Sequence, residues 1–252
     1  MNVKTNGTKE WARSNVNVAF GCSNDCRYCY AKRIAQRFNR IYAYTWKHMI
    51  INQKAVNKTY KKRSGVVMFP SSHDITPMVK NECFIVLKKL LESGNRVIIV
   101  SKPNLSIIAE LCEKFKKYQE QLLLRFTLTS ICEDTLRFWE PGAPTFQERL
   151  AALQYAYEHG FTTSVSIEPF LTNPQHTYNF VRDYVNESVW IGIMSGIPKF
   201  ENPIHQQFSE AVKMLRDTSN LKDVYERMKN LKYIRFKDGF MNALILNLKK
   251  VA

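Results

Sequence analysis

Short apolar runs rich in branched residues alternate along the chain with longer stretches in which apolar residues recur every three or four positions. The runs predict strands, and the longer stretches predict helices between them. The predicted strands cover residues 15–20, 65–70, 96–103, 122–131, 162–170 and 188–196. The predicted helices cover residues 31–50, 76–94, 105–121, 144–160, 176–187 and 208–219. Strands separated by helices of this length are typical of parallel βα units with right-handed crossovers.

The predicted fold class is α/β, as a partial (β/α)6 barrel of the TIM type with a small C-terminal extension. Strands this apolar suit a sheet that is covered on both faces. A complete eight-unit barrel takes about 250 residues, and here six units end by residue 217. A doubly wound open sheet is the alternative, because the pattern does not distinguish a closed sheet from an open one. We therefore predict a partial-barrel domain over residues 1–217.

Residues 218–252 form the predicted C-terminal extension, whose conformation the pattern leaves open. Lys237, Asp238 and Gly239 are able to turn a hairpin. Asp238 is equally able to cap a helix that carries Phe240, Leu244 and Leu248 on one face. We favour the helix.

The composition adds a strong positive charge to this picture. The 252 residues contain 37 Lys and Arg against 22 Asp and Glu, so the net charge is +15. Clustered cations favour a polyanionic partner such as nucleic acid, although a merely solubilising surface gives the same total. No run approaches the roughly 18 to 20 apolar residues of a membrane span, and the N-terminus lacks an apolar signal region. We expect a cytoplasmic monomer without membrane contact.

The cysteines indicate the chemistry more directly. Three of the six, Cys22, Cys26 and Cys29, fall within eight positions. A disulfide inside this group would leave one thiol over, and a zinc site normally has a fourth ligand, for which His48 in a helical stretch is the nearest candidate. Three thiolates without an evident fourth ligand suit a [4Fe–4S] cluster that keeps one iron open.

Polar residues follow the predicted strands at the points where each ends. The cysteine loop follows the first strand, and in α/β folds ligands bind beyond the carboxyl ends of the strands. Each of these polar residues is also an ordinary helix cap, so both interpretations stay open. The residues in question are Ser71, Ser72, His73, Asp74, Ser101, Lys102, Thr129, Ser130, Glu168 and Ser195.

The spacing Cys22-x3-Cys26-x2-Cys29, with Tyr28 at the aromatic position, resembles the signature of the radical SAM superfamily. The resemblance implies that the three thiolates hold a [4Fe–4S] cluster whose fourth iron binds S-adenosylmethionine. An unidentified reductant would supply the electron that cleaves S-adenosylmethionine to a 5′-deoxyadenosyl radical. This radical abstracts hydrogen from a substrate.

Further segments over roughly residues 16–170 resemble the spore photoproduct lyase-like branch, and two later segments resemble phage-associated radical-SAM-like proteins. The lyase-like resemblance implies that Lys102 and Ser130, and less directly Ser72, contact S-adenosylmethionine. It also implies a radical-handling role for Tyr30. Glu168 follows the fifth strand, where it would bind nucleoside hydroxyls or pair with Lys102. The segments that carry these resemblances are GCSNDCRYCY, MFPSSHDITP, IIVSKPNL, the stretch from FTLTSI to QERLAAL, SIEPF and VWIGIMSG.

The chain also departs from the lyase. Ser71 stands where the lyase has the cysteine that donates a hydrogen atom, and a serine O–H bond is too strong for that step. Cys83 and Cys132 are the remaining thiols near the predicted site, but both lie in stretches that predict burial. The lyase's lesion-binding C-terminal region is also missing. We therefore predict that the chain is not a competent spore photoproduct lyase. His73 and Asp74 would orient substrate or transfer protons, or else form a capped turn.

Three functions remain open at this point. The first is a radical SAM enzyme acting on a nucleic acid or nucleotide, and the second is one acting on a peptide, protein or metabolite. The third is a non-catalytic module that binds metal and nucleic acid. The first is favoured if the basic groups converge on the open end of the barrel. These groups are Arg33, Arg37 and Arg40; Lys54, Lys58, Lys61, Lys62 and Arg63 with Tyr60; and Lys229, Lys232, Arg235 and Lys237 with Tyr233 and Phe236.

Overall fold

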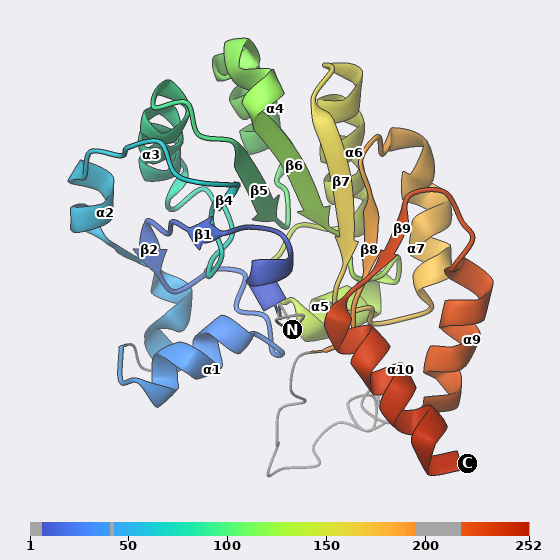
Figure 1. Ribbon diagram of the computed structural model, residues 1–252. Coiled ribbons are helices and arrows are strands. Elements are labelled where there is room, and N and C mark those ends of the chain that lie inside the picture. The colour runs from blue at the N-terminus through green and yellow to red at the C-terminus, as the bar shows by residue number, and fades with distance from the viewer. Residues whose placement is uncertain (1–6, 41–42, 195–217, 252) are drawn as a thin grey trace.

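A curved sheet of seven parallel strands forms the frame of the molecule (Figure 1). The structure is a computed structural model and describes residues 7–40, 43–194 and 218–251. The strands follow the order β1-β4-β5-β6-β7-β8-β9, and among the described residues the two edge strands do not pair with each other. Their bounds are β1 Ser14–Asn15, β4 Val67–Met68, β5 Val97–Ser101, β6 Leu122–Thr127, β7 Thr162–Ile167, β8 Val189–Ile191 and β9 Ile234–Phe236. The predicted α/β partial barrel is thus confirmed, as an open one.

The connecting segments are helical, as predicted. They comprise α1 Tyr30–Arg37, α2 Gln53–Asn57, α3 Lys80–Glu92, α4 Leu105–Lys114, α5 Glu133–Trp139, α6 Phe146–Glu158, α7 Pro174–Val181, α9 Thr218–Met228 and α10 Asp238–Val251. Short 3-10 turns add η1 Gly7–Glu10, η2 Ala43–His48, η3 Lys116–Gln121 and η4 Arg182–Tyr184. Most of the predicted helix at 208–219, and Ser195, lie outside the described residues.

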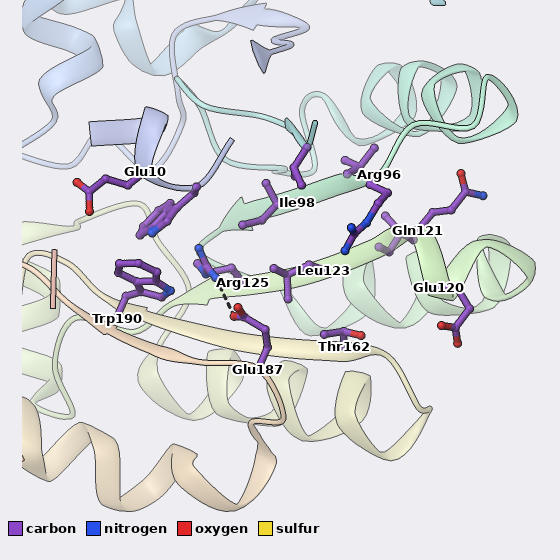
Figure 2. Close-up of a pocket in the computed structure, with 14 residues that line it drawn as sticks. Glu10, Arg96, Ile98, Glu120, Gln121, Leu123, Arg125, Thr162, Glu187 and Trp190 are labelled. Carbon is purple, nitrogen blue, oxygen red and sulfur yellow. Dashed lines mark hydrogen bonds and ion pairs between the residues drawn. The ribbon is translucent and has the colours of Figure 1, made fainter. Parts of the chain in front are cut away.

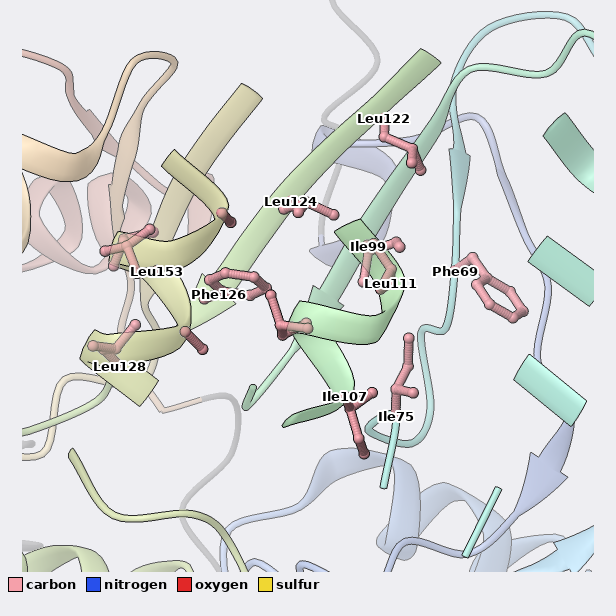
Figure 3. Packing of buried hydrophobic residues seen from close by; sticks show 14 of the residues in the cluster. Phe69, Ile75, Ile99, Ile107, Leu111, Leu122, Leu124, Phe126, Leu128 and Leu153 are labelled. Carbon is pink, nitrogen blue, oxygen red and sulfur yellow. The ribbon is translucent and has the colours of Figure 1, made fainter. Parts of the chain in front are cut away.

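The side chains of β6 alternate between the hydrophobic core on one face of the sheet and the cavities on the other. Leu122, Leu124 and Phe126 belong to the main hydrophobic core, which packs under the helices (Figure 3). Because side chains alternate across a strand, Arg125 and Thr127 point to the concave side, where they line cavities. The helices therefore bury one face of the sheet, and the concave face is left for ligands.

The region after β1 differs from the prediction. The predicted first strand at 15–20 is split into β1 and β2 (Ala19–Phe20), and β2 pairs antiparallel with β3 (Ile50–Ile51). The predicted helix at 31–50 ends at Arg37. Asn39 and Met49 adopt left-handed backbone conformations, with φ of 51° and 48°, which a continuing helix does not allow.

The C-terminal segment supplies a strand that the pattern does not predict. Residues 234–236 form β9, which pairs parallel with β8 and makes seven strands instead of six. The favoured helix is confirmed as α10, in which Phe240 and Leu244 are buried. The side chain of Leu248 lies outside the described part. The domain boundary between 217 and 218 stays a prediction.

The N-terminal turn η1 contacts the opposite edge of the open sheet. The ammonium of Lys237, between β9 and α10, donates to the carbonyl of Gly7 at 2.9 Å and lies 3.1 Å from the carboxylate of Glu10. The backbone N–H of Asp238 donates to the same carboxylate at 3.1 Å. These contacts join the first residues before β1 to the last strand, so η1 spans the open side of the barrel.

Candidate active site

A cavity of about 930 Å³ lies at the carboxyl ends of the strands, within the concave face of the sheet. Its size is at the upper end of what small-molecule and cofactor sites usually show. The strand-end residues Ser101 and Thr129 do not line it, but most predicted site residues do: Cys22, Cys26, Tyr28, Cys29, Tyr30, Ser71, Ser72, His73, Asp74, Lys102 and Glu168. Ser130 is absent from the lining.

The loop that carries the three cysteines is held in shape by backbone contacts. Gly21 has a φ of 96°, and a Cβ there would lie 2.3 Å from the carbonyl oxygen of Trp46, so only glycine fits. The N–H of Cys22 donates to this same carbonyl at 2.9 Å. At the far end, the sulfur of Cys29 accepts from the N–H of Lys32 and caps α1. Cys22 and Cys26 are buried, and Cys29 is half-buried.

The turn after α5 packs directly onto the cysteine loop. The N–H of Gly142 donates to the carbonyl of Asn24 at 3.1 Å, and the N–H of Arg27 donates to the carbonyl of Trp139 at 2.8 Å. A Cβ on Gly142 would lie 2.3 Å from the carbonyl oxygen of Ser23. The segment around residues 140–143 is therefore the support of the loop.

The thiols of Cys22, Cys26 and Cys29 are suitable ligands for an iron–sulfur cluster. Burial raises the pKa of Cys26 to about 12 and also raises the pKa of Cys22 and Cys29. These thiols are therefore protonated unless a strong cation binds them, and iron is such a cation. Among the described residues, no group of three or more Cys, His, Asp or Glu is arranged to hold a single metal ion. A [4Fe–4S] cluster makes a different demand, because each thiolate binds a different iron.

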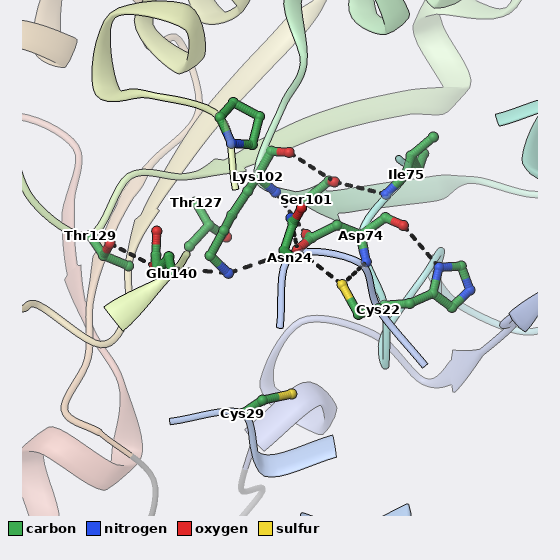
Figure 4. Close-up of polar contacts among 12 residues, drawn as sticks. Cys22, Asn24, Cys29, Asp74, Ile75, Ser101, Lys102, Thr127, Thr129 and Glu140 are labelled. Carbon is green, nitrogen blue, oxygen red and sulfur yellow. Dashed lines mark hydrogen bonds and ion pairs between the residues drawn. The ribbon is translucent and has the colours of Figure 1, made fainter. Parts of the chain in front are cut away.

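Asp74 joins the cysteine loop to the neighbouring strand ends (Figure 4). Its carboxylate accepts from the side-chain amide of Asn24 at 2.7 Å and from the backbone N–H of Lys102 at 2.8 Å. Its own N–H donates to the sulfur of Cys22 at 3.4 Å. Burial opposes ionisation of Asp74, but the charge and N–H of Lys102, with Asn24, lower its pKa below the ordinary value. Asp74 is thus a carboxylate in the folded protein.

Lys102 lies between two carboxylates. Its ammonium is 3.9 Å from Asp74 and 4.0 Å from Glu140, and 5.6 Å from the centre of the Tyr28 ring. Burial opposes its charge, but Cys26, Tyr28 and the two carboxylates together raise its pKa well above the ordinary value. Lys102 therefore carries a buried positive charge at the wall of the cavity, where it is predicted to contact S-adenosylmethionine.

Glu140 anchors this network from the other side. It accepts from the hydroxyls of Tyr28 and Thr129 and forms an ion pair with Arg149 at 2.6 Å. Arg149 also donates to the carbonyl of Pro144 at 2.7 Å. Tyr28, placed by the cysteine motif, is thereby tied to α6. The sequence pattern does not single out Arg149, because its position in a predicted helix is typical of many arginines.

Asn17, which the sequence pattern does not single out, organises the turn after β4. Its side-chain oxygen accepts from the N–H groups of Ser71 and Ser72 at 2.7 and 3.0 Å. The hydroxyl of Tyr30 donates to the carbonyl of Ser71. Burial, with the nearby Cys29, raises the pKa of Tyr30 to about 12. Tyr30 therefore keeps its phenol proton and sits across the mouth of the cavity.

His73 makes structural contacts. Its Nε2 accepts from the backbone N–H groups of Val18 and Ala19 at 3.1 and 3.3 Å, and its Nδ1 lies 3.0 Å from the carbonyl of Asp74. This pattern requires the neutral ring with its proton on Nδ1, and burial lowers the pKa of His73 accordingly. The ring holds the chain between β1 and β2 against the turn after β4.

Two sequence expectations are corrected by the contacts. Glu168 pairs with Lys237, 3.9 Å away, whereas the partners of Lys102 are Asp74 and Glu140. Cys132 was expected to be buried, but it is exposed at the start of α5, whereas Cys83 is buried as expected.

The hydroxyl of Ser130 lies 2.9 Å from that of Thr172 and accepts from the N–H of Cys132. Its predicted role in binding S-adenosylmethionine stays a prediction.

The opposite end of the barrel is closed by a stack of aromatic rings and cations. Trp11 and Trp190 meet edge to face with ring centres 5.7 Å apart. The guanidinium of Arg125 lies 4.7 Å from the Trp11 ring and forms an ion pair with Glu187 at 2.8 Å (Figure 2). A smaller cavity of about 290 Å³ lies at this amino-terminal end and shares Glu10 and Trp11 with the larger one. Trp11 therefore lies between the two cavities, whereas Arg125 and Trp190 line the smaller one.

Comparison with known proteins identifies the family. The model of the Radical SAM superfamily matches residues 16–176, well over half of the chain. The chain belongs to the radical SAM superfamily. The cofactors of this superfamily are a [4Fe–4S] cluster and S-adenosylmethionine.

One viral protein and two groups of solved structures are among the proteins similar to this chain. "Uncharacterized protein ORF301" of Acidianus two-tailed virus is 25% identical over 191 residues, which are 71% of this chain and 60% of that protein. A spore photoproduct lyase mutant with bound AdoMet and dinucleoside spore photoproduct has a TM-score of 0.51 at 14% identity, covering 88% of this chain and 75% of the lyase. Streptococcus suis SuiB bound to S-adenosylmethionine has a TM-score of 0.51 at 11% identity, covering 91% of this chain and 52% of SuiB. These structures share the fold of this radical SAM protein.

No helix in the described ranges is long and apolar enough to cross a membrane.

Replacing Gly142 by Ala is expected to displace the cysteine loop, since the added Cβ would lie 2.3 Å from the carbonyl of Ser23. Overpacking of this kind costs about 1 to 3 kcal/mol. The iron content per chain after anaerobic reconstitution should fall, while the circular dichroism spectrum stays that of a folded protein. Gly239→Ala is the matched control, because a Cβ there meets nothing within 4 Å. Full iron content in the Gly142→Ala protein would contradict the supporting role of this turn.

The carboxyl of Glu168 is expected to make the free energy of unfolding depend on pH. Burial, with Glu10, raises its pKa to about 7 against the opposing charges of Lys237 and Arg125. Between about pH 4.3 and 7 the folded state therefore binds more protons than the unfolded state. The stabilisation that comes from the proton on Glu168 is fully present below the unfolded pKa and is lost as the pH rises through 7. Glu168→Gln should therefore raise the free energy of unfolding by up to about 3 kcal/mol at pH 8, with little effect at pH 4.

Urea unfolding at the two pH values measures this difference. Glu226→Gln, at an exposed site on α9, serves as the control and should change neither value. An effect of Glu168→Gln that is the same at both pH values would show that the carboxyl does not titrate in this window.

Proposed function

We propose that this radical SAM enzyme holds its [4Fe–4S] cluster on Cys22, Cys26 and Cys29 and acts on a nucleic acid or nucleotide. The observation that carries the first part is the convergence of the three thiols with Asp74 and Lys102 on one cavity. With an electron from an external reductant, the bound cofactors supply cleavage of S-adenosylmethionine to a 5′-deoxyadenosyl radical that abstracts hydrogen from substrate.

The residues around the cluster position the cofactor and exclude water. The charge of Lys102 suits the carboxylate of S-adenosylmethionine, while Asp74 is the acceptor available to its amino group. Ser72 remains a further candidate contact, since it lines the same cavity. At the amino end of the barrel, Trp11 lies between this cavity and the smaller one, and it packs against Trp190 and Arg125.

The residues at the rim of the cavity favour a nucleic acid as the substrate. Ala31, Ile34, Ala35 and Arg40 on and after α1 line the cavity, so this helix borders its mouth. On the outer side, Phe38 is 60% exposed, and the guanidiniums of Arg37 and Arg40 lie 6.0 and 5.4 Å from the centre of its ring. An exposed aromatic ring flanked by arginines is the combination that stacks on bases and neutralises phosphates.

The other basic groups do not form such a rim. Tyr60, expected to be available for stacking, is buried and donates to the carbonyl of Ala55. Lys237 is buried beside the cavity in contact with Glu10, and Tyr233 and Phe236 pack against the core. The group at α1, and not the total charge, therefore favours a nucleic-acid substrate.

The chain is not proposed to repair the lesion that gives spore photoproduct lyase its name. Ser71 occupies the expected cysteine position, and its hydroxyl accepts from the amide of Asn17 at 3.1 Å. Cys83 is fully buried on α3, and Cys132 is absent from the cavity lining. The enzyme is proposed to work as a monomer, with the radical directed to another position of its substrate.

Cys26→Ala tests the cluster assignment. Anaerobically reconstituted wild-type protein should contain about four iron per chain and, when reduced, release 5′-deoxyadenosine from S-adenosylmethionine. Cys26→Ala should lose both properties, whereas Cys83→Ala, which removes a thiol of the core, should keep both as long as it folds. A wild-type protein with one zinc per chain and no iron would contradict the proposed function.

Arg37→Gln/Arg40→Gln tests the nucleic-acid rim. Binding of mixed-sequence single-stranded DNA and RNA to the holoenzyme should weaken as salt rises, and the double variant should reduce the slope of log K against log salt by about 2. The control Arg182→Gln/Arg227→Gln removes the same charge from exposed sites on η4 and α9. Equal slopes for the two double variants would show that α1 does not contact phosphates.

A further inference from the structure

The end of the cavity opposite the cysteine loop is built from three charged side chains. Glu168 follows β7, Lys237 lies between β9 and α10, and Glu10 lies in η1, and all three line the cavity. Thr127 and Ser166 point to it from β6 and β7, and Trp11 and Phe240 give it apolar walls. Nothing in the cysteine motif explains this second polar group.

Glu168 is held in place by close packing. A Cβ on Gly192 would lie 2.7 Å from the Cγ of Glu168, so the glycine leaves room for the stem of this side chain. The lysine beside it is already engaged, since Lys237 donates to the carbonyl of Gly7, contacts Glu10 at 3.1 Å and lies 4.0 Å from the centre of the Trp11 ring. The position of the Glu168 carboxylate is therefore set by its neighbours.

The carboxylate of Glu168 nevertheless lacks a hydrogen-bond donor. The nearest cation is Lys237 at 3.9 Å, which is beyond hydrogen-bond distance, and no N–H or O–H of the described residues donates to it. At pH 8, above its pKa of about 7, Glu168 is mostly ionised. An ionised carboxylate only accepts, and its two oxygens suit two parallel donors. Two carboxylates and one ammonium also give this end a net charge of −1, which disfavours a phosphate there. The group that fits is neutral and presents N–H donors.

We propose that Glu168 reads the base that enters the cavity, and that the base is guanine. This rests on the proposed function, in which phosphates stay at the α1 rim, and enzymes that act on a base bring it out of the stack into the active site. Guanine presents two adjacent donors, N1–H and the 2-amino group, to a carboxylate. Adenine and cytosine place one amino donor beside an acceptor nitrogen, and thymine and uracil place one N–H between two carbonyls.

The proposal assigns Glu168 to the substrate and not to S-adenosylmethionine. The same carboxylate would disfavour thymine, because the carbonyl oxygens of thymine would face the negatively charged oxygens of Glu168. Rejection of the wrong base by unfavourable contacts is as effective for specificity as attraction of the right one.

A guanosine-to-inosine exchange tests the inference, since inosine lacks only the 2-amino group. The probe is a short oligothymidylate with one central guanosine or inosine, bound at pH 8 to the reconstituted holoenzyme with S-adenosylmethionine and followed by fluorescence anisotropy. The wild-type enzyme should bind the guanosine probe about tenfold more tightly, in line with about 1.4 kcal/mol for a lost hydrogen bond to a charged acceptor. Glu168→Gln should abolish this preference, and Glu226→Gln should retain it.

The outcomes separate this inference from the function on which it rests. Equal affinity of the wild-type enzyme for both probes, or an unchanged preference in Glu168→Gln, overturns the role of Glu168 while leaving the nucleic-acid rim intact. If the wild-type enzyme binds neither probe at low salt, the proposed function is contradicted, and this inference with it.

Discussion

The carboxylate of Asp74 is the contact on which the site depends. It is buried, and it accepts from the side chain of Asn24 in the cysteine loop and from the backbone of Lys102 at the end of β5. A buried carboxylate without such partners would be costly, and these donors make ionisation favourable. Because the same carboxylate also faces the Lys102 ammonium, one charge fixes the loop, the strand end and the cation together. The cysteine loop and the cavity wall that carries Lys102 are therefore joined through a single carboxylate.

The alternation of apolar runs and helical stretches was enough to predict the fold class, since strands covered by helices must be apolar. It did not predict β9, because residues 234–236 have only one neighbouring strand and lie half-buried at the sheet edge. It also joined β1 and β2 into one strand, because the turn between them depends on hydrogen bonds to His73, a residue more than fifty positions away. Local patterns do not carry long-range contacts of this kind.

The same distinction holds for the site. Cysteine spacing and strand-end polarity located Cys22, Asp74 and Lys102, because motif and topology place these residues at one edge. Asn17, Arg149 and Lys237 were not identified as site residues, since each acts through a partner distant in sequence. The net charge of +15 was the least informative feature, because among the described residues of the basic groups only Arg40 and the buried Lys237 line the cavity.

The central claim is that the radical formed beside the three cysteines acts on a nucleic acid. Transfer of deuterium tests it most directly, because the abstracted atom is carried into 5′-deoxyadenosine. The reduced holoenzyme is incubated with S-adenosylmethionine and single-stranded DNA or RNA that carries carbon-bound deuterium throughout, and the released 5′-deoxyadenosine is analysed by mass spectrometry. The account predicts deuterium in 5′-deoxyadenosine. Product that forms at the same rate with and without nucleic acid, and never carries deuterium, would contradict it.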